Sequence, residues 1–148
     1  YTWHHAVVVP AGHALASSKQ LTLDAVAEHP IITYHQGFTG RSRIDEAFGK
    51  AEIDPDIVME ALDADVIKAY VELGLGIGII ASMAFDAERD PHLRLIDAKH
   101  LFNVNTSRIA VRRGTYLRGY AQRFMQLCSP KLTEKAVRAA SERDGLGE

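Results

Sequence analysis

The feature that most constrains the fold is a regular alternation of short apolar runs with amphipathic stretches of helical period. Runs rich in Val and Ile predict strands over residues 6–9, 31–34, 57–61 and 77–81. Apolar spacing predicts helices over 21–28, over 41–51 and from Asp63 onward. This order is typical of an α/β fold in which flanking helices cover a mostly parallel sheet.

The regular pattern of apolar and amphipathic segments changes after about residue 86. Further strands are predicted at 93–96 and 107–113, and further helices at 116–128 and 131–143. The first of these helices has an apolar face that we expect to be buried, made of Leu117, Tyr120, Phe124, Leu127 and Cys128. The residues from Asp144 onward are expected to fray.

Size, charge and cysteine content exclude several classes of protein. A chain of 148 residues fits one domain or two small lobes. A net charge of −2 argues against an autonomous nucleic-acid-binding module, which carries a basic excess. The single cysteine, Cys128, excludes an internal disulfide framework. The sequence has neither a membrane-spanning apolar run nor a signal-peptide pattern, and it opens within a strand, so we expect a piece of a longer protein.

The sequence carries no recognisable enzyme or cofactor signature. It lacks a nucleophile elbow, a metalloprotease helix motif, a phosphate-binding loop and paired cysteines. Its seven histidines show no spacing that would pair them on a helix, so no metal site is predicted. Gly74, Gly76 and Gly78 lie after a helix and before a strand, the reverse of a dinucleotide motif. We interpret them as a helix stop followed by close helix–strand packing.

The strongest candidate site is the turn that joins the strand 31–34 to the following helix. Such a turn faces the ligand crevice of an α/β sheet, and the free amides of the helix favour an anion there. Gly37 and Gly40 allow close backbone approach, the hydroxyls of Thr39 and Ser42 can donate to an oxyanion, and Arg41 could add a charge. Alternatively, Thr39 only caps the helix and Arg41 is solvated.

A second acidic turn lies at the same edge of the predicted sheet. Asp63 and Asp65 could bind an amino group, although capping of the helix that follows is the favoured interpretation. His35 is the sole candidate base near Thr39, and no nucleophile is paired with it. The sequence therefore predicts a binding protein and not an enzyme.

Three segments resemble LysR-type transcriptional regulators: GFTGRS (37–42), DADVIK (63–68) and GLGIGIIASMA (74–84). The last is common to the whole family. The first two, together with IASMA, are more specific to its CysB/Cbl branch, which controls sulfur assimilation. The resemblance extends from Tyr1 to about Thr133.

The resemblance implies an effector-binding domain with the two-lobed architecture of type II periplasmic binding proteins, a small ligand lying between the lobes. Residues 1–104 would form the second lobe. Residues 105–128 would cross back to add a strand and a helix to the first lobe, and residues 129–148 would form a C-terminal helix and tail. The DNA-binding helix-turn-helix and most of the first lobe would lie outside this chain.

The resemblance also suggests an effector and partners. The effector would be sulfate or a related metabolite such as O-acetylserine, N-acetylserine or adenosine phosphosulfate. Thr39 matches the cleft threonine of the family, and Trp3 matches an aromatic residue near its cavity. A cytoplasmic homodimer or homotetramer that binds DNA, without a cofactor, is implied. The alternative is a periplasmic-type solute-binding protein for a small anion.

Overall fold

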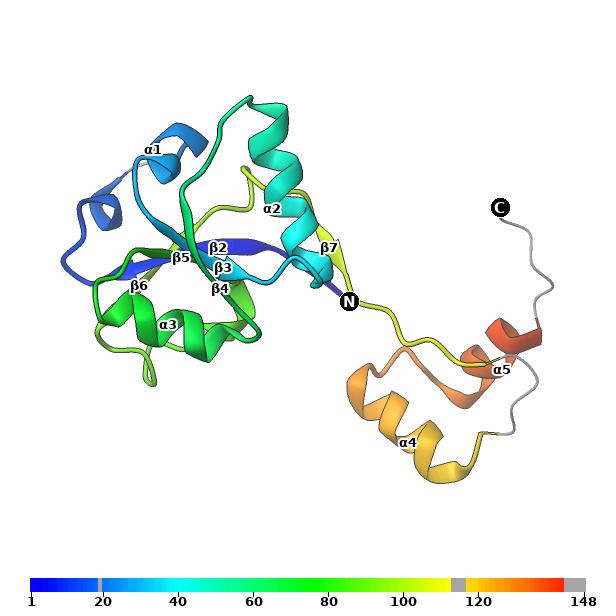
Figure 1. Cartoon of the computed structure of the whole chain (residues 1–148). Helices are drawn as coiled ribbons and strands as arrows, with labels where there is room; N and C mark the ends of the chain where they lie inside the picture. The colour runs from blue at the N-terminus through cyan, green and yellow to red at the C-terminus, as the bar shows by residue number, and fades with distance from the viewer. Residues whose placement is uncertain (19, 113–116, 143–148) are drawn as a thin grey trace. The chain divides into compact units, whose positions relative to one another are not determined.

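The computed structural model describes residues 1–18, 20–112 and 117–142 (Figure 1). The chain divides into two compact units, Tyr1–Ser107 and Arg108–Glu148. The first unit contains all the strands of the described residues, and the second contains two helices.

The first unit is built on a five-stranded sheet in the order β4-β3-β5-β2-β6. Its strands are β2 (His5–Pro10), β3 (Ile31–Tyr34), β4 (Ile57–Ala61), β5 (Ile77–Ala81) and β6 (Leu93–Asp97). The strand β3 pairs in parallel with β4 and β5, whereas β2 pairs antiparallel with β5 and β6. The sheet is therefore mixed, and the single reversed strand β2 accounts for both departures from the expected parallel arrangement.

Helices cover both faces of this sheet (Figure 1). On one face lie α1 (Leu23–Ala27) and α2 (Thr39–Lys50), and on the other lies α3 (Ala64–Glu72). The short 3-10 helices η1 (Ala14–Ser17) and η2 (Ser82–Ala84) lie in the connections. This arrangement follows from the sequence pattern, because successive strand residues point to opposite faces and each face needs an apolar cover.

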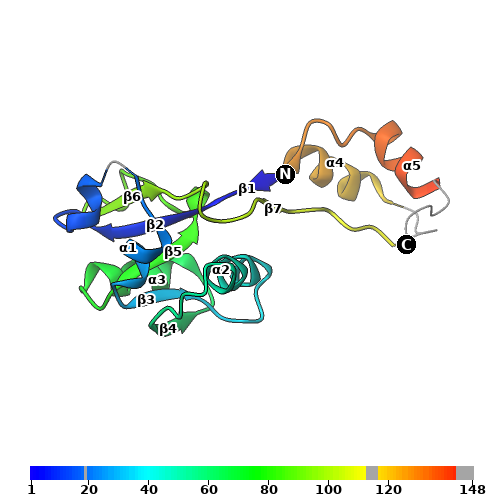
Figure 2. The same ribbon diagram turned by 90° about the horizontal axis from the view of Figure 1, so that it is seen from above.

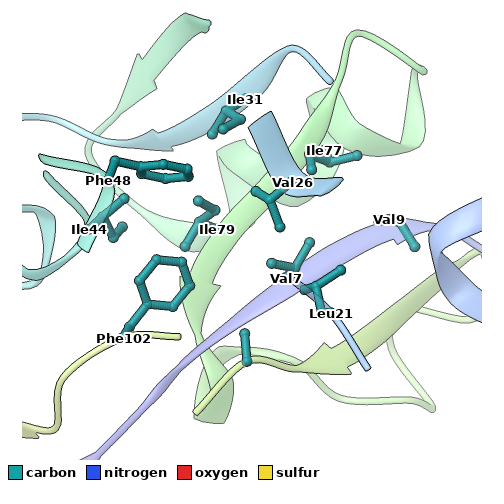
Figure 3. Packing of buried hydrophobic residues seen from close by; sticks show 11 residues of the cluster. Val7, Val9, Leu21, Val26, Ile31, Ile44, Phe48, Ile77, Ile79 and Phe102 are labelled. Atoms are coloured by element: carbon teal, nitrogen blue, oxygen red, sulfur yellow. The ribbon is translucent and has the colours of Figure 1, made fainter. Parts of the chain in front are cut away.

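The two faces of the sheet form two separate cores. On the α1 and α2 side, Val7 and Ile79 of the sheet pack with Ile44 and Phe48 of α2 and with Phe102 (Figure 3). On the α3 side the core consists of Val8, Ile32, Ala61, Ile67, Val71, Ile80 and Leu93. Alternation of Val7 and Val8 between the cores confirms that β2 is buried on both faces, as its continuous apolar run indicates.

Local sequence signals predicted most of these elements correctly. The predicted strands 31–34, 57–61 and 77–81 have the same bounds as β3, β4 and β5. Thr22 caps α1, its hydroxyl accepting from the Ala25 amide at 3.2 Å. Asp63 caps α3, its carboxylate accepting from the Val66 amide at 2.9 Å. The capping interpretation of Asp63 is therefore confirmed. Gly74 adopts a φ of 78° and ends the helix as predicted.

A two-stranded ribbon extends from the sheet (Figure 2). It pairs β1 (Thr2–Trp3) antiparallel with β7 (Asn105–Thr106). The prediction of a strand over 107–113 is wrong, since residues 107–112 have no strand structure and Arg113 lies outside the described residues. A strand needs a hydrogen-bonding neighbour, and the two residues of β1 pair with Asn105 and Thr106, before this segment.

The second unit contains α4 (Gly119–Cys128) and α5 (Glu134–Glu142). The apolar face predicted for the helix 116–128 has five residues, and the prediction that it is buried is wrong for four of them. Tyr120, Phe124, Leu127 and Cys128 are exposed. Met125 is the buried residue of α4, and two short helices cannot cover a wider face. None of the described helices is both long enough and apolar enough to cross a membrane.

Candidate functional site

The candidate turn lies at one edge of the sheet, where several elements converge. The parallel strands β3 and β5 end there, at Tyr34 and Ala81. The reversed strand β2 starts there, since His5 pairs with Ala81. The Tyr34 hydroxyl accepts a hydrogen bond from the Ala81 amide at 3.1 Å, which ties the two strand ends together. The start of α2 follows directly, so its first turn is held by the sheet edge.

Hydrogen bonds within the turn fix the approach to α2. The imidazole of His35 accepts from the Gly37 amide through Nδ1 at 3.1 Å, and the His35 carbonyl accepts from the Phe38 amide at 3.0 Å. The ring of Phe38 stacks on Tyr34 with centroids 6.1 Å apart. His35 is therefore used to shape the turn, a role that its position alone does not reveal.

Gly40 lies buried in the first turn of α2, against two aromatic rings. A Cβ at this position would lie 2.9 Å from Cη2 of Trp3 and 3.0 Å from Nε2 of His5. Amides in the first turn of a helix lack an intrahelical acceptor. The absence of a side chain at Gly40 thus lets the first turn of α2 pack directly against Trp3 and His5.

Arg41 is committed to internal partners. Its guanidinium donates through Nε to Asp45 at 2.6 Å, and through Nη1 to the Tyr34 carbonyl at 2.8 Å and to the Glu60 carboxylate. Burial lowers the pKa of Arg41, but the hydrogen bonds to Asp45 and Glu60 outweigh it and raise that pKa overall. The expectation that Arg41 offers its charge directly to an anion, or is solvated, does not match this arrangement. Arg41 instead joins α2 to β3 and β4.

The other predicted residues lie at the same corner. Trp3 is half-buried on β1, and Ser42 is exposed in the first turn of α2. The backbone of Thr39 begins α2, but its side chain lies outside the described part of the chain. The structure thus brings Trp3 next to the helix start, although the two segments are more than thirty residues apart in the sequence.

His5 is the residue of this corner that sequence reasoning missed. It is fully buried, with its ring edge-on to Trp3 and Phe102 at centroid distances of 5.0 and 5.6 Å. Burial, helped by nearby His4, lowers the pKa of His5 to about 4, so its imidazole is neutral near pH 7. The Nδ1 atom lies 3.3 Å from the Asn105 amide nitrogen. Its place directly before the apolar run of β2 was the available signal.

Metal binding finds no structural support among the described residues, where no three acidic, histidine or cysteine side chains gather. The corner instead combines helix amides, a neutral imidazole and an indole. Such a set of uncharged donors suits a small oxyanion.

Comparison with known proteins identifies the family. Residues 1–133 match the model of the LysR substrate binding domain. The chain is 53% identical to the HTH-type transcriptional regulator SsuR of Burkholderia cenocepacia over 137 residues, covering 93% of the chain and 44% of SsuR. It is 52% identical to CysB of the same organism over 140 residues, covering 95% of the chain and 45% of CysB. The chain therefore spans less than half the length of these relatives.

A solved structure shows the same fold. The cofactor-binding domain of the Cbl transcriptional regulator matches with a TM-score of 0.88 and 42% identity, covering 97% of this chain and 63% of that one. This likeness confirms the predicted α/β fold of the type II periplasmic-binding-like class. The chain belongs to the LysR family, as an effector-binding domain of the CysB/Cbl/SsuR type in the sulfur-related branch.

Proposed function

We propose that the chain senses a small oxyanionic metabolite of sulfur metabolism, either sulfate or a relative such as O-acetylserine, N-acetylserine or adenosine phosphosulfate. The ligand lies at the start of α2, where Thr39, Gly40, Ser42 and Trp3 contribute to its site. Arg41 supports the site by holding α2 on the sheet. Occupancy shifts the balance between arrangements of a longer regulator and so changes its affinity for DNA.

One observation carries the proposal: the first turn of α2 is packed around a glycine at the edge of the sheet, beside a buried neutral imidazole. The amides of that turn and the helix dipole favour a negative charge. Uncharged donors can hold an oxyanion by hydrogen bonds, without a full counter-charge. Relatives named as transcriptional regulators support the same conclusion.

The exposed apolar surface of α4 supports a further part of the proposal, which concerns the two lobes of the effector domain. Tyr120, Phe124 and Leu127 are exposed by 65–73% on this helix. An apolar helical face of this kind is typical of a helix that packs against another part of its domain. It supports the prediction that residues 105–128 complete a first lobe and residues 1–104 form the second. A cytoplasmic homodimer or homotetramer that binds DNA through a separate domain completes the proposal.

Isothermal titration of an intact effector domain that contains this chain, with sulfate and with O-acetylserine, tests the site. Wild type should bind at least one of them. Thr39→Ala should bind it about tenfold more weakly, because a hydrogen bond to a charged ligand contributes roughly 1.5–3 kcal/mol.

Thr22→Ala is the matched control. Its hydroxyl caps α1, so the variant should lose about 1 kcal/mol of stability and keep wild-type affinity. Equal affinities of wild type and Thr39→Ala for both ligands would remove Thr39 from the site.

A solute-binding transport component is not favoured, because the matching relatives are named as transcriptional regulators. The sequence upstream of Tyr1 separates the two functions. A helix-turn-helix there supports the regulator, and a secreted leader supports the transport component.

A further inference from the structure

The corner at the start of α2 contains a hydrogen-bond donor that the fold leaves unsatisfied. In the described part of the chain, two buried side-chain nitrogens have no hydrogen-bond partner: Nδ1 of His4 and Nε2 of His5. Of the two, Nε2 of His5 contacts the first turn of α2, next to Gly40. Leaving a buried polar group unpaired costs about 1–3 kcal/mol, so this nitrogen invites an explanation.

The neighbouring amide defines the chemistry of that nitrogen. The Asn105 amide nitrogen can only donate, so its contact with Nδ1 of His5 at 3.3 Å makes Nδ1 the acceptor. The neutral ring therefore carries its proton on Nε2. This places an N–H donor, without an acceptor, beside the amides of the helix start.

Trp3 covers this donor. Its ring lies edge-on to His5 and close to Gly40, and together they shield Nε2 from solvent. The cover is held weakly: the indole Nε1 donates to the Ser107 hydroxyl at 3.1 Å in an exposed position, and β1 is paired over two residues. Segments with few buried contacts and exposed hydrogen bonds open at low free-energy cost.

We propose that Trp3 is a movable cover over His5, and that an oxyanion at the start of α2 accepts a hydrogen bond from Nε2 of His5 once Trp3 has shifted. The inference rests on the proposed function and adds His5 to its site. The ligand gives the orphaned donor its acceptor, so the penalty carried by the unliganded corner is relieved on binding. A donor without lone pairs also favours a fully ionised oxyanion, such as sulfate, over one that must itself donate a proton.

Calorimetric titration of the same intact effector domain with sodium sulfate at pH 7, against sodium chloride of equal ionic strength, measures the affinity. His5→Phe keeps a ring between Trp3 and Phe102 but removes the donor, and should bind sulfate about tenfold more weakly. His5→Gln retains an N–H donor and should stay within a few-fold of wild type. His92→Phe, an exposed substitution far along the chain, should bind like wild type.

The fluorescence of Trp3 tests the cover directly, because it is the single tryptophan of the chain. Its emission should change saturably with sulfate and not with chloride. Calorimetric binding without any change in emission would overturn the movable cover.

Other outcomes separate the inference from the proposed function. Equal affinities of wild type and a folded His5→Phe would overturn the role of His5 and leave the anion site standing. If wild type does not bind sulfate, sulfate is excluded as the ligand both in the proposed function and in the proposed contact with His5. Should His5→Phe fail to unfold cooperatively, the nuclear magnetic resonance signal of the wild-type His5 imidazole decides. A saturable shift with sulfate supports the contact, and an unchanged signal overturns it.

Discussion

Gly76→Ala is expected to lower the free energy of unfolding by about 3 kcal/mol. A Cβ at Gly76 would collide with the carbonyl oxygen of Pro30 and lie 3.0 Å from its carbonyl carbon. That oxygen accepts the hydrogen bond from the Ile77 amide at 2.8 Å, where β5 begins beside β3. Backbone cannot move aside as a flexible side chain can, so the strain falls on the pairing of the two central strands. Chemical denaturation measures the loss.

Gly49→Ala provides the matched control. Gly49 lies in α2, and a Cβ there would meet nothing within 4 Å. The same substitution should therefore raise the free energy of unfolding by up to about 1 kcal/mol, because alanine favours the helix more than glycine does. A Gly76→Ala variant as stable as wild type would contradict the close packing described for this loop.

The stability of the chain is expected to fall by roughly 3 kcal/mol as the pH is lowered from 6.5 to 4, owing to His5. Burial, with a smaller effect of His4, lowers the folded-state pKa of His5 from 6.5 to about 4. Between these values the unfolded chain binds a proton that the folded chain rejects, so acid favours unfolding. Above pH 6.5 His5 is mainly neutral in both the folded and the unfolded chain, so it no longer lowers the free energy of unfolding.

Denaturation curves across this pH range check the expectation. His5→Phe should lose most of the slope. A smaller slope of the same sign should remain, because burial and then His29 lower the pKa of His13 as well. Three carboxyl groups, those of Glu46, Asp90 and Asp97, also have lowered pKa values, and their contribution to stability is lost mainly below about pH 5. An unchanged slope in His5→Phe would show that His5 is protonated without cost in the folded chain.

Sequence reasoning works here where one local rule decides the outcome. The strands at 31–34, 57–61 and 77–81 are predictable because their β-branched runs begin directly after Pro30, Asp56 and Gly76. The caps Thr22 and Asp63 are predictable for the same reason, since a cap contacts amides only three residues away. The close helix–strand packing predicted for the glycine run occurs at Gly78 of β5, where a Cβ would lie 2.9 Å from Ile67 of α3.

Prediction from the sequence fails where the interaction partner of a residue is distant in the sequence. The partners of Arg41 on α2 include Glu60 on β4, which lies 19 residues further along the chain. The surroundings of His5 come from Trp3, Phe102 and Asn105, so neither its burial nor its lowered pKa is visible locally. The exposed face of α4 is a failure of another kind. Helical period shows that a face seeks cover, and it does not show which chain segment supplies that cover.

The central claim is that the first turn of α2 holds a small oxyanion. Nuclear magnetic resonance of an isotope-labelled effector domain that contains this chain, titrated with sulfate at constant ionic strength, tests it. The largest saturable shifts should fall on the backbone amide of Gly40 and the indole of Trp3. Saturable shifts that leave this corner unchanged and gather elsewhere, for example at the exposed face of α4, would contradict it.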